Sequence, residues 1–120
     1  ENENEGYDIV YTQDSNTLAA NCEEIRGLGS SNLTLQGNSL GNAMRGGSGD
    51  DTLTGHDGAD KFLLYLEMGN DVVTDYNPAE GDEVLLAFGL SGYDYTLSSD
   101  YVLYTLSDNS SLQLNYEIIV

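Results

Sequence analysis

Large apolar residues recur at intervals of nine in the middle of the chain. They are Leu35, Met44, Leu53 and Phe62. An α-helix would need an apolar residue every three or four positions. A short strand such as TLT (52–54) instead points one side chain inward per nine residues, and the residues between such strands form a turn. The pattern therefore predicts turn–strand units that stack in order to bury their apolar side chains.

The turns between these positions are rich in glycine and aspartate. GGSGDDTLT (46–54) and GHDGADKFL (55–63) share glycine at block positions one and four, aspartate at six and a large apolar residue at eight. The preceding block, GNSLGNAMR (37–45), has Asn42 at position six. Downstream, MGNDVV restores Gly69 and Asp71 after a two-residue insertion, and AEGDEV supplies Asp82. Glycine suits such turns because it tolerates positive φ.

The arrangement of these turns predicts a cation site. Successive strands of a flattened coil fall on opposite sides, so turns two repeats apart stack on the same edge. We expect Asp51 to lie beside Asp71, and Asp60 beside both Asn42 and Asp82. Carboxylates packed in this way repel one another unless a cation lies between them, and six or more oxygens at about 2.3–2.6 Å describe a calcium site. Folding is then coupled to calcium binding.

The C-terminal part has a different pattern. From Tyr93 the repeats stop, and YDYTL, DYVLYTL and SSLQLNYEIIV predict strands, with a turn at SDNSS (107–111). Apolar residues alternate in the last of these, at Leu112, Leu114, Tyr116, Ile118 and Val120. We expect an antiparallel cap at the open end of the roll, since a terminal strand would otherwise expose an edge. Residues 7–11 are a candidate strand at the opposite end.

Composition narrows the classes of partner. The 120 residues fit one small domain, and 21 acidic residues against Arg26, Arg45 and Lys61 give a net charge of −18. This charge disfavours nucleic acid and anionic membranes, and it favours cations. The lone Cys22 excludes an internal disulfide, so a metal is the obvious substitute for one in a small secreted domain. Neither a membrane-spanning run nor a signal peptide is present, which leaves a cytosolic protein, one exported by another route, or the end of a longer chain.

The repeats resemble those of RTX (repeats-in-toxin) proteins. GGSGDDTLTG is similar to their nonapeptide G-G-x-G-x-D-x-U-x, where U is a large apolar residue. Residues 8–44 resemble the degenerate turns that precede strict repeats. NDVVTDYNPAEGDEVLLAFGL (70–90) resembles the segment that closes the roll in serralysin-type metalloproteases, and the final EIIV resembles the end of many type I secretion substrates. The resemblance implies a calcium-binding parallel β-roll, secreted from a bacterium by the type I machinery and unfolded in the calcium-poor cytosol.

The expected architecture is all-β, a single RTX-like domain over 1–120. It divides into degenerate turns (7–45), a calcium-binding β-roll (46–85) and an antiparallel cap with a secretion-like tail (86–120). Two calcium sites are expected, Asp51 with Asp71 and Asp60 with Asp82, and none upstream of Asp51. The candidate metal-binding residues are Gly47, Gly49, Asp51, His56, Gly58, Asp60, Gly69, Asp71 and Asp82.

Three function classes remain. The first is a non-catalytic calcium-dependent folding and export module at the C-terminus of a secreted protein, whose upstream domain is catalytic or an adhesin. The second is a calcium-dependent polysaccharide-binding module, resembling those appended to alginate epimerases, although three basic residues are few for an anionic polymer. The third is an independent enzyme. It is disfavoured because His56 is the only histidine, Cys22 has no evident base, and the aspartates occupy repeat positions.

Overall fold

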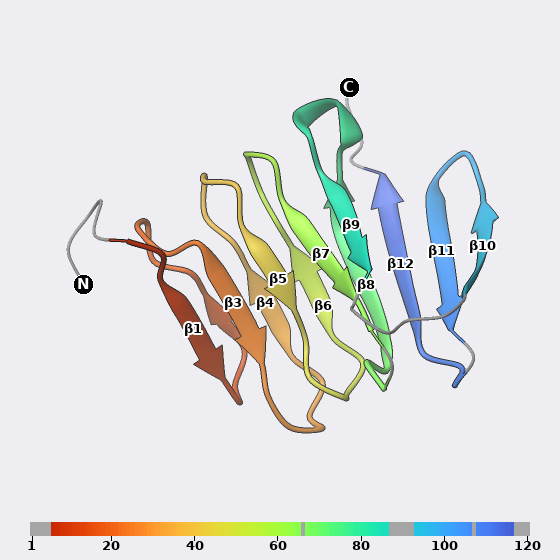
Figure 1. Ribbon diagram of the computed structural model, residues 1–120, viewed down its shortest axis with the longest axis horizontal. Coiled ribbons are helices and arrows are strands. Elements are labelled where there is room, and N and C mark those ends of the chain that lie inside the picture. The colour runs from red at the N-terminus through yellow and green to blue at the C-terminus, as the bar shows by residue number, and fades with distance from the viewer. Residues whose placement is uncertain (1–5, 66, 87–92, 107, 117–120) are drawn as a thin grey trace.

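The computed structural model describes residues 6–65, 67–86, 93–106 and 108–116, which are almost entirely β-structure in two facing sheets (Figure 1). The five-stranded sheet contains, in spatial order, β1 (Ile9–Thr12), β3 (Glu24–Gly27), β5 (Ala43–Arg45), β7 (Lys61–Leu64) and β9 (Glu83–Leu86). The seven-stranded sheet contains β10 (Tyr93–Leu97), β11 (Tyr101–Leu106), β12 (Ser111–Tyr116), β8 (Asn70–Tyr76), β6 (Thr52–Thr54), β4 (Thr34–Gln36) and β2 (Asn16–Thr17).

Successive strands from β1 to β9 alternate between the two sheets, and neighbours within each sheet run parallel. This is the parallel β-roll that the nine-residue spacing predicts, and the predicted fold class is confirmed. The register follows the repeat directly, because Leu35 pairs with Leu53 and Met44 with Phe62. Parallel pairing already begins at β1, within the segment of degenerate turns.

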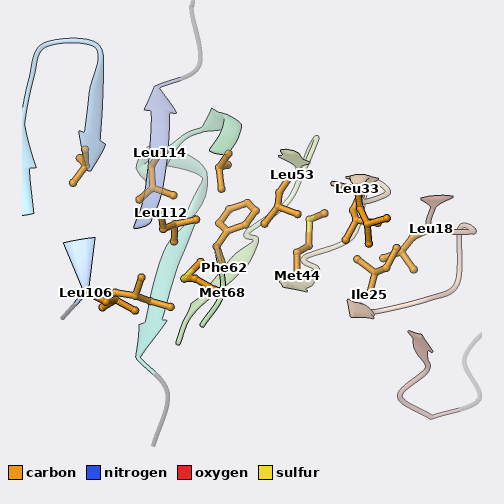
Figure 2. Packing of buried hydrophobic residues seen from close by; sticks show 14 residues of the cluster. Leu18, Ile25, Leu33, Met44, Leu53, Phe62, Met68, Leu106, Leu112 and Leu114 are labelled. Carbon is orange, nitrogen blue, oxygen red and sulfur yellow. The ribbon is translucent and has the colours of Figure 1, made fainter. Parts of the chain in front are cut away.

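The core is one row of apolar side chains between the sheets. Figure 2 shows Met44, Leu53 and Phe62 packed side by side along the roll, and all three are buried. Their neighbours in sequence point outward because side chains alternate along a strand. Fully burying a side chain of this size contributes about 1.5–3 kcal/mol, so the row supplies much of the stability of a domain this small.

The C-terminal strands prolong the seven-stranded sheet. β10 pairs antiparallel with β11, and β11 pairs antiparallel with β12, as expected. β12 joins β8 in parallel. The predicted alternation holds at Leu112 and Leu114, which are buried and extend the core beyond β8 (Figure 2). The tail at 117–120, with the expected apolar positions Ile118 and Val120, lies outside the described residues. The division of the domain at 45 and 85 stays a prediction.

A short 3₁₀ turn, η1 (Pro78–Glu80), joins β8 to β9. Asn77 caps it, because its side chain accepts a hydrogen bond from the backbone of Ala79, and Gly81 ends it at a φ of 96°. The turn delivers Asp82 to the edge of the roll. Among the described residues, no helix has the length and hydropathy needed to cross a membrane.

Candidate metal centre

The connections between strands stack along two edges of the roll. The Asp51 edge is formed by the segments that lead into β4, β6 and β8 and by the start of β8, and it carries Asp51 and Asp71. The Asp60 edge is formed by the segments that lead into β5, β7 and β9, and it carries Asn42, Asp60 and Asp82. The residues that we expected to be neighbours therefore lie on the same edge of the roll.

Hydrogen bonds connect the stacked turns of the Asp51 edge. The N–H of Leu33 donates to Oδ1 of Asp51, and the N–H of Asp51 donates to Oδ1 of Asp71, both at 2.8 Å. The structure thus brings Asp51 and Asp71 together, as the repeat spacing suggests. One oxygen of each carboxylate is used to hold the turn before it.

The Asp60 edge repeats this arrangement. The N–H of Asn42 donates to Oδ1 of Asp60, and the N–H of Asp60 donates to Oδ1 of Asp82, again at 2.8 Å. Asp60 therefore lies between Asn42 and Asp82, as expected. The same side-chain position performs the same structural task in both edges.

The second carboxylate oxygen has no such task in three of the aspartates. Oδ2 of Asp51, Asp60 and Asp71 is buried and lacks a hydrogen-bond partner, and these residues are 1%, 0% and 1% exposed. A buried acceptor without a partner costs about 1–3 kcal/mol, and more when it is charged. Such oxygens fit a hard cation, which prefers carboxylate ligands.

Asp82 differs from the other three aspartates. Its Oδ2 accepts a hydrogen bond from the N–H of Asn77 at 2.9 Å, while Oδ1 accepts from Asp60. Asp82 thus has both oxygens engaged within the fold. The unpartnered oxygen on this edge belongs to Asp60.

Burial disfavours the charged form of these carboxyl groups. It raises the pKa of Asp71 to about 8, with the carboxylates of Asp51 and Asp50 adding to the effect. Burial likewise raises the pKa of Asp60 to about 7, with Asp82 and Asp75 nearby, and raises the pKa of Asp51. Without a cation, the sites are therefore poised to take up protons near neutral pH.

Two glycines make room for the unpartnered oxygens. A β-carbon at Gly46 would lie 1.9 Å from Oδ2 of Asp51, and one at Gly55 would lie 2.3 Å from Oδ2 of Asp60. Neither glycine is among the predicted site residues, although both occupy position one of the repeat. Because position one is glycine in both blocks, the repeat itself could have identified these two residues.

The predicted glycines lie where stacked backbones touch. A β-carbon would fall within 2.6 Å of a carbonyl oxygen of the preceding turn on the same edge at each of Gly47, Gly49, Gly58 and Gly69. Gly58 and Gly69 also have positive φ, 94° and 76°. Backbone carbonyls are therefore close at hand, but the glycines' first role is to let the turns approach one another.

His56 is placed differently from the other candidates. Its imidazole lies on the exposed surface, where Nε2 is 2.8 Å from Oε1 of Gln36. Its backbone has a φ of 65°, and its N–H, with that of Gly55, donates to the carboxylate of Asp75. Only the backbone of His56 belongs to the turn, and Asp75, which repeat spacing did not single out, holds it.

Upstream of Asp51, Asn42 occupies the position equivalent to Asp51 and Asp60, and Asn38 lies in the same turn at position two. Asn38 donates from Nδ2 to the carbonyls of Ala19 and Cys22, at 2.6 and 2.8 Å. Nδ2 of Asn42 donates to Oδ1 of Asn38 at 3.0 Å and to the Cys22 carbonyl at 3.2 Å. Amide hydrogens thus satisfy the oxygens that a cation would otherwise gather.

In the described part of the chain, no three side chains of His, Cys, Asp or Glu converge on one point. A calcium ion, which takes 6–8 oxygen ligands, would therefore need backbone carbonyls besides the aspartates. The stacked turns offer both kinds of oxygen. The residues present fit such an ion at Asp51, Asp60 and Asp71.

Comparison with known proteins supports the fold. No protein-family model matches this chain, and no curated protein matches it. Among solved structures, the extracellular lipase LipA from Serratia marcescens is similar, with a TM-score of 0.68 and 21% identity over 96% of this chain. At this identity the likeness shows the fold alone. The match spans only 18% of the length of the lipase.

Proposed function

We propose that this chain is a non-catalytic calcium-binding β-roll module whose folding depends on calcium. The observation that carries the proposal is the set of buried, unpartnered Oδ2 atoms of Asp51, Asp60 and Asp71. A bound Ca²⁺ supplies positive charge that neutralises these carboxylates and gathers nearby carbonyl oxygens. Asp82 supports the Asp60 site by holding the backbone of Asp60.

The size of the effect is sufficient to control folding. Extracellular calcium modules bind with Kd values of about 10⁻⁴–10⁻³ M. One site at 100 times its Kd adds about 2.7 kcal/mol to the free energy of unfolding. Two sites would add about 5 kcal/mol, comparable with the whole stability of a small domain. The net charge of −18 opposes the compact state when no cation is bound.

This calcium dependence suits a secreted protein. Cytosolic calcium is too low to fill sites of this affinity, so the chain stays unfolded until it reaches millimolar calcium outside the cell. A similar solved structure is that of an extracellular lipase, of which this chain matches 18%. We infer that this module follows a catalytic or adhesin domain in the same polypeptide and leaves a bacterial cell by type I export.

Calorimetric titration with calcium tests the proposal on the wild type and on Asp60→Asn. The asparagine keeps an oxygen for the N–H of Asn42 but removes the charge, so we expect a lower stoichiometry, or at least tenfold weaker binding at one site. Asp57→Asn is the matched control, since Asp57 is an exposed residue of the same turn. Equal loss in both variants, or no calcium binding by the wild type, would refute the calcium site.

A further inference from the structure

All of the chain's positive side chains lie on one face. Arg26 is on β3, Arg45 on β5 and Lys61 on β7, which are adjacent strands of the five-stranded sheet. Arg26 pairs in register with Arg45, and Lys61 pairs with Ala43. Met44 and Phe62 point into the core, so Arg45 and Lys61, which adjoin them, point outward. A molecule with 21 acidic residues thus has a single basic face.

This face is hollowed. A cavity of about 290 Å³ is lined by Tyr7, Glu24, Arg26, Ala43, Arg45 and Lys61. Ala43 lies between Glu24 and Lys61 in the sheet register, and its small side chain leaves the space. Leu63 and Leu85 line the hollow as well and give it an apolar side. We call this cavity the basic hollow.

The guanidinium of Arg45 is held in place by an aromatic ring. Its guanidinium carbon lies 5.1 Å from the ring centroid of Tyr65, whose hydroxyl donates to the carbonyls of Gly46 and Gly47. In the described part of the chain, Nε of Arg45 is buried without a hydrogen-bond partner. The ring thus fixes the position of a cation that lines the hollow.

The other charges of the hollow are only partly balanced. Within the described residues, the sole ion pair joins Arg26 to Glu24, which also accepts a hydrogen bond from Tyr7 at 2.8 Å. Lys61 is exposed and forms no ion pair there, although Glu83 is its register partner. Like charges opposite one another, such as Arg26 and Arg45, destabilise a sheet, so an anion between them would relieve a cost.

We propose that the basic hollow binds a carboxylated sugar, namely a uronate unit of an acidic polysaccharide. Arg45 and Lys61 donate to the carboxylate, and Glu24 accepts from ring hydroxyls. Tyr7, which is 60% exposed, offers a flat ring beside them. A neutral sugar would leave both cations unpaired, and an acidic peptide would lack the ring hydroxyls that donate to Glu24.

This proposal goes beyond calcium-dependent folding and rests on a different face of the molecule. Three basic residues are few for an anionic polymer if they are scattered, but here they surround one hollow. Calcium would be needed only to keep the roll folded.

The test is titration with a uronic acid trisaccharide, a neutral trisaccharide and a glutamate tripeptide at low ionic strength, with saturating calcium throughout. Binding by calorimetry and amide chemical shifts are the two readouts. We expect only the uronate to bind, with shifts confined to the region around Ala43 and Lys61, and binding that weakens as salt is added. No uronate binding, or equal binding of the neutral sugar or the peptide, would overturn the proposal.

Substitutions separate the hollow from the overall charge. Lys61→Gln and Arg45→Gln should each weaken uronate binding tenfold or more. Gln113→Glu changes the net charge by the same amount from the opposite sheet and should leave the affinity within twofold. Thermal melting with calcium confirms that each variant is folded, and exposed Lys61 keeps the test valid if Arg45→Gln is unstable. Unchanged affinity in Lys61→Gln, or equal loss in Gln113→Glu, would overturn the assignment.

Discussion

The contrast between Asn42 and Asp60 shows how single residues decide where a cation is needed. Both occupy position six of a repeat on the same edge, and both use one oxygen to accept a backbone hydrogen bond. Nδ2 of Asn42 donates a hydrogen bond to a backbone carbonyl. Oδ2 of Asp60, at the same place, is a buried oxygen without a partner. The polar atoms of the Asn42 turn are satisfied by hydrogen bonds within the protein, whereas the carboxylate of the Asp60 turn requires a bound cation.

Asn42→Asp should extend the calcium requirement to the upstream turns. The new carboxylate would lose the donated bonds to Asn38 and Cys22 and would lie beside Asp60. A buried oxygen without a partner costs about 1–3 kcal/mol, so we expect the variant to need a higher calcium concentration than the wild type in order to fold. Circular dichroism during calcium titration of both proteins measures this shift. An unchanged midpoint of the calcium titration would contradict a cation-replacing role for Asn42.

The raised pKa values predict an unusual pH dependence in the absence of calcium. The pKa of Asp60 is about 7 and that of Asp71 about 8 in the folded chain, against 3.8 for the free group. Because the folded values are higher, the stability from these protons is present at low pH and is lost as the pH rises through 7 and 8.

Far-ultraviolet circular dichroism of the metal-free chain should therefore show β-structure at about pH 5 that is lost toward about pH 8, where the chain without calcium is largely unfolded. Calcium affinity should rise over the same interval because protons compete for the carboxylates. Asp71→Asn should flatten this loss of β-structure with pH, since it removes the group with the highest of these pKa values. β-structure that increases with pH in calcium-free buffer would contradict the burial described for these groups.

At the scale of elements, the turns and strands have separate determinants. The strands need only one inward side chain each, as at Leu53 and Phe62, and this is why the nine-residue spacing was enough to predict them. The turns depend on close approach between chains far apart in sequence. Position four glycines were recognised as site residues, but the position one glycines, Gly46 and Gly55, proved to be the ones beside the unpartnered oxygens.

Gly46→Ala tests that close approach. The added β-carbon would lie 1.9 Å from Oδ2 of Asp51, so the carboxylate or the turn must move. We expect calcium binding at the Asp51 edge to weaken at least tenfold, measured by calorimetry. Ser48→Ala, at an exposed residue of the same turn, should change affinity less than twofold. Wild-type affinity in Gly46→Ala would show that this oxygen does not take part in binding.

Other features lay beyond the reach of a single sequence. Tyr65, Asp75 and Arg45 act through residues that become neighbours only when the coil closes, and no local spacing marks them. The C-terminal alternation correctly predicted the buried face of Leu112 and Leu114. It did not reveal that β12 joins the roll in parallel, because alternation is the same for either strand direction.

At the scale of the whole molecule, the few positive charges are gathered on one sheet, which also carries Glu24 and Glu83. Carboxylates line the two turn edges, while the three basic residues gather on the five-stranded sheet. The net charge of −18 makes the compact state costly, and the apolar row between the sheets is a modest core. Calcium at the edges would decide whether this balance favours the folded chain.

The most direct test is far-ultraviolet circular dichroism during a calcium titration at constant ionic strength, with magnesium as the comparison cation. The account predicts a largely unfolded spectrum in chelator, a cooperative gain of β-structure as calcium reaches the millimolar range, and little response to magnesium. A full β spectrum and an unchanged cooperative melting transition in chelator would contradict it.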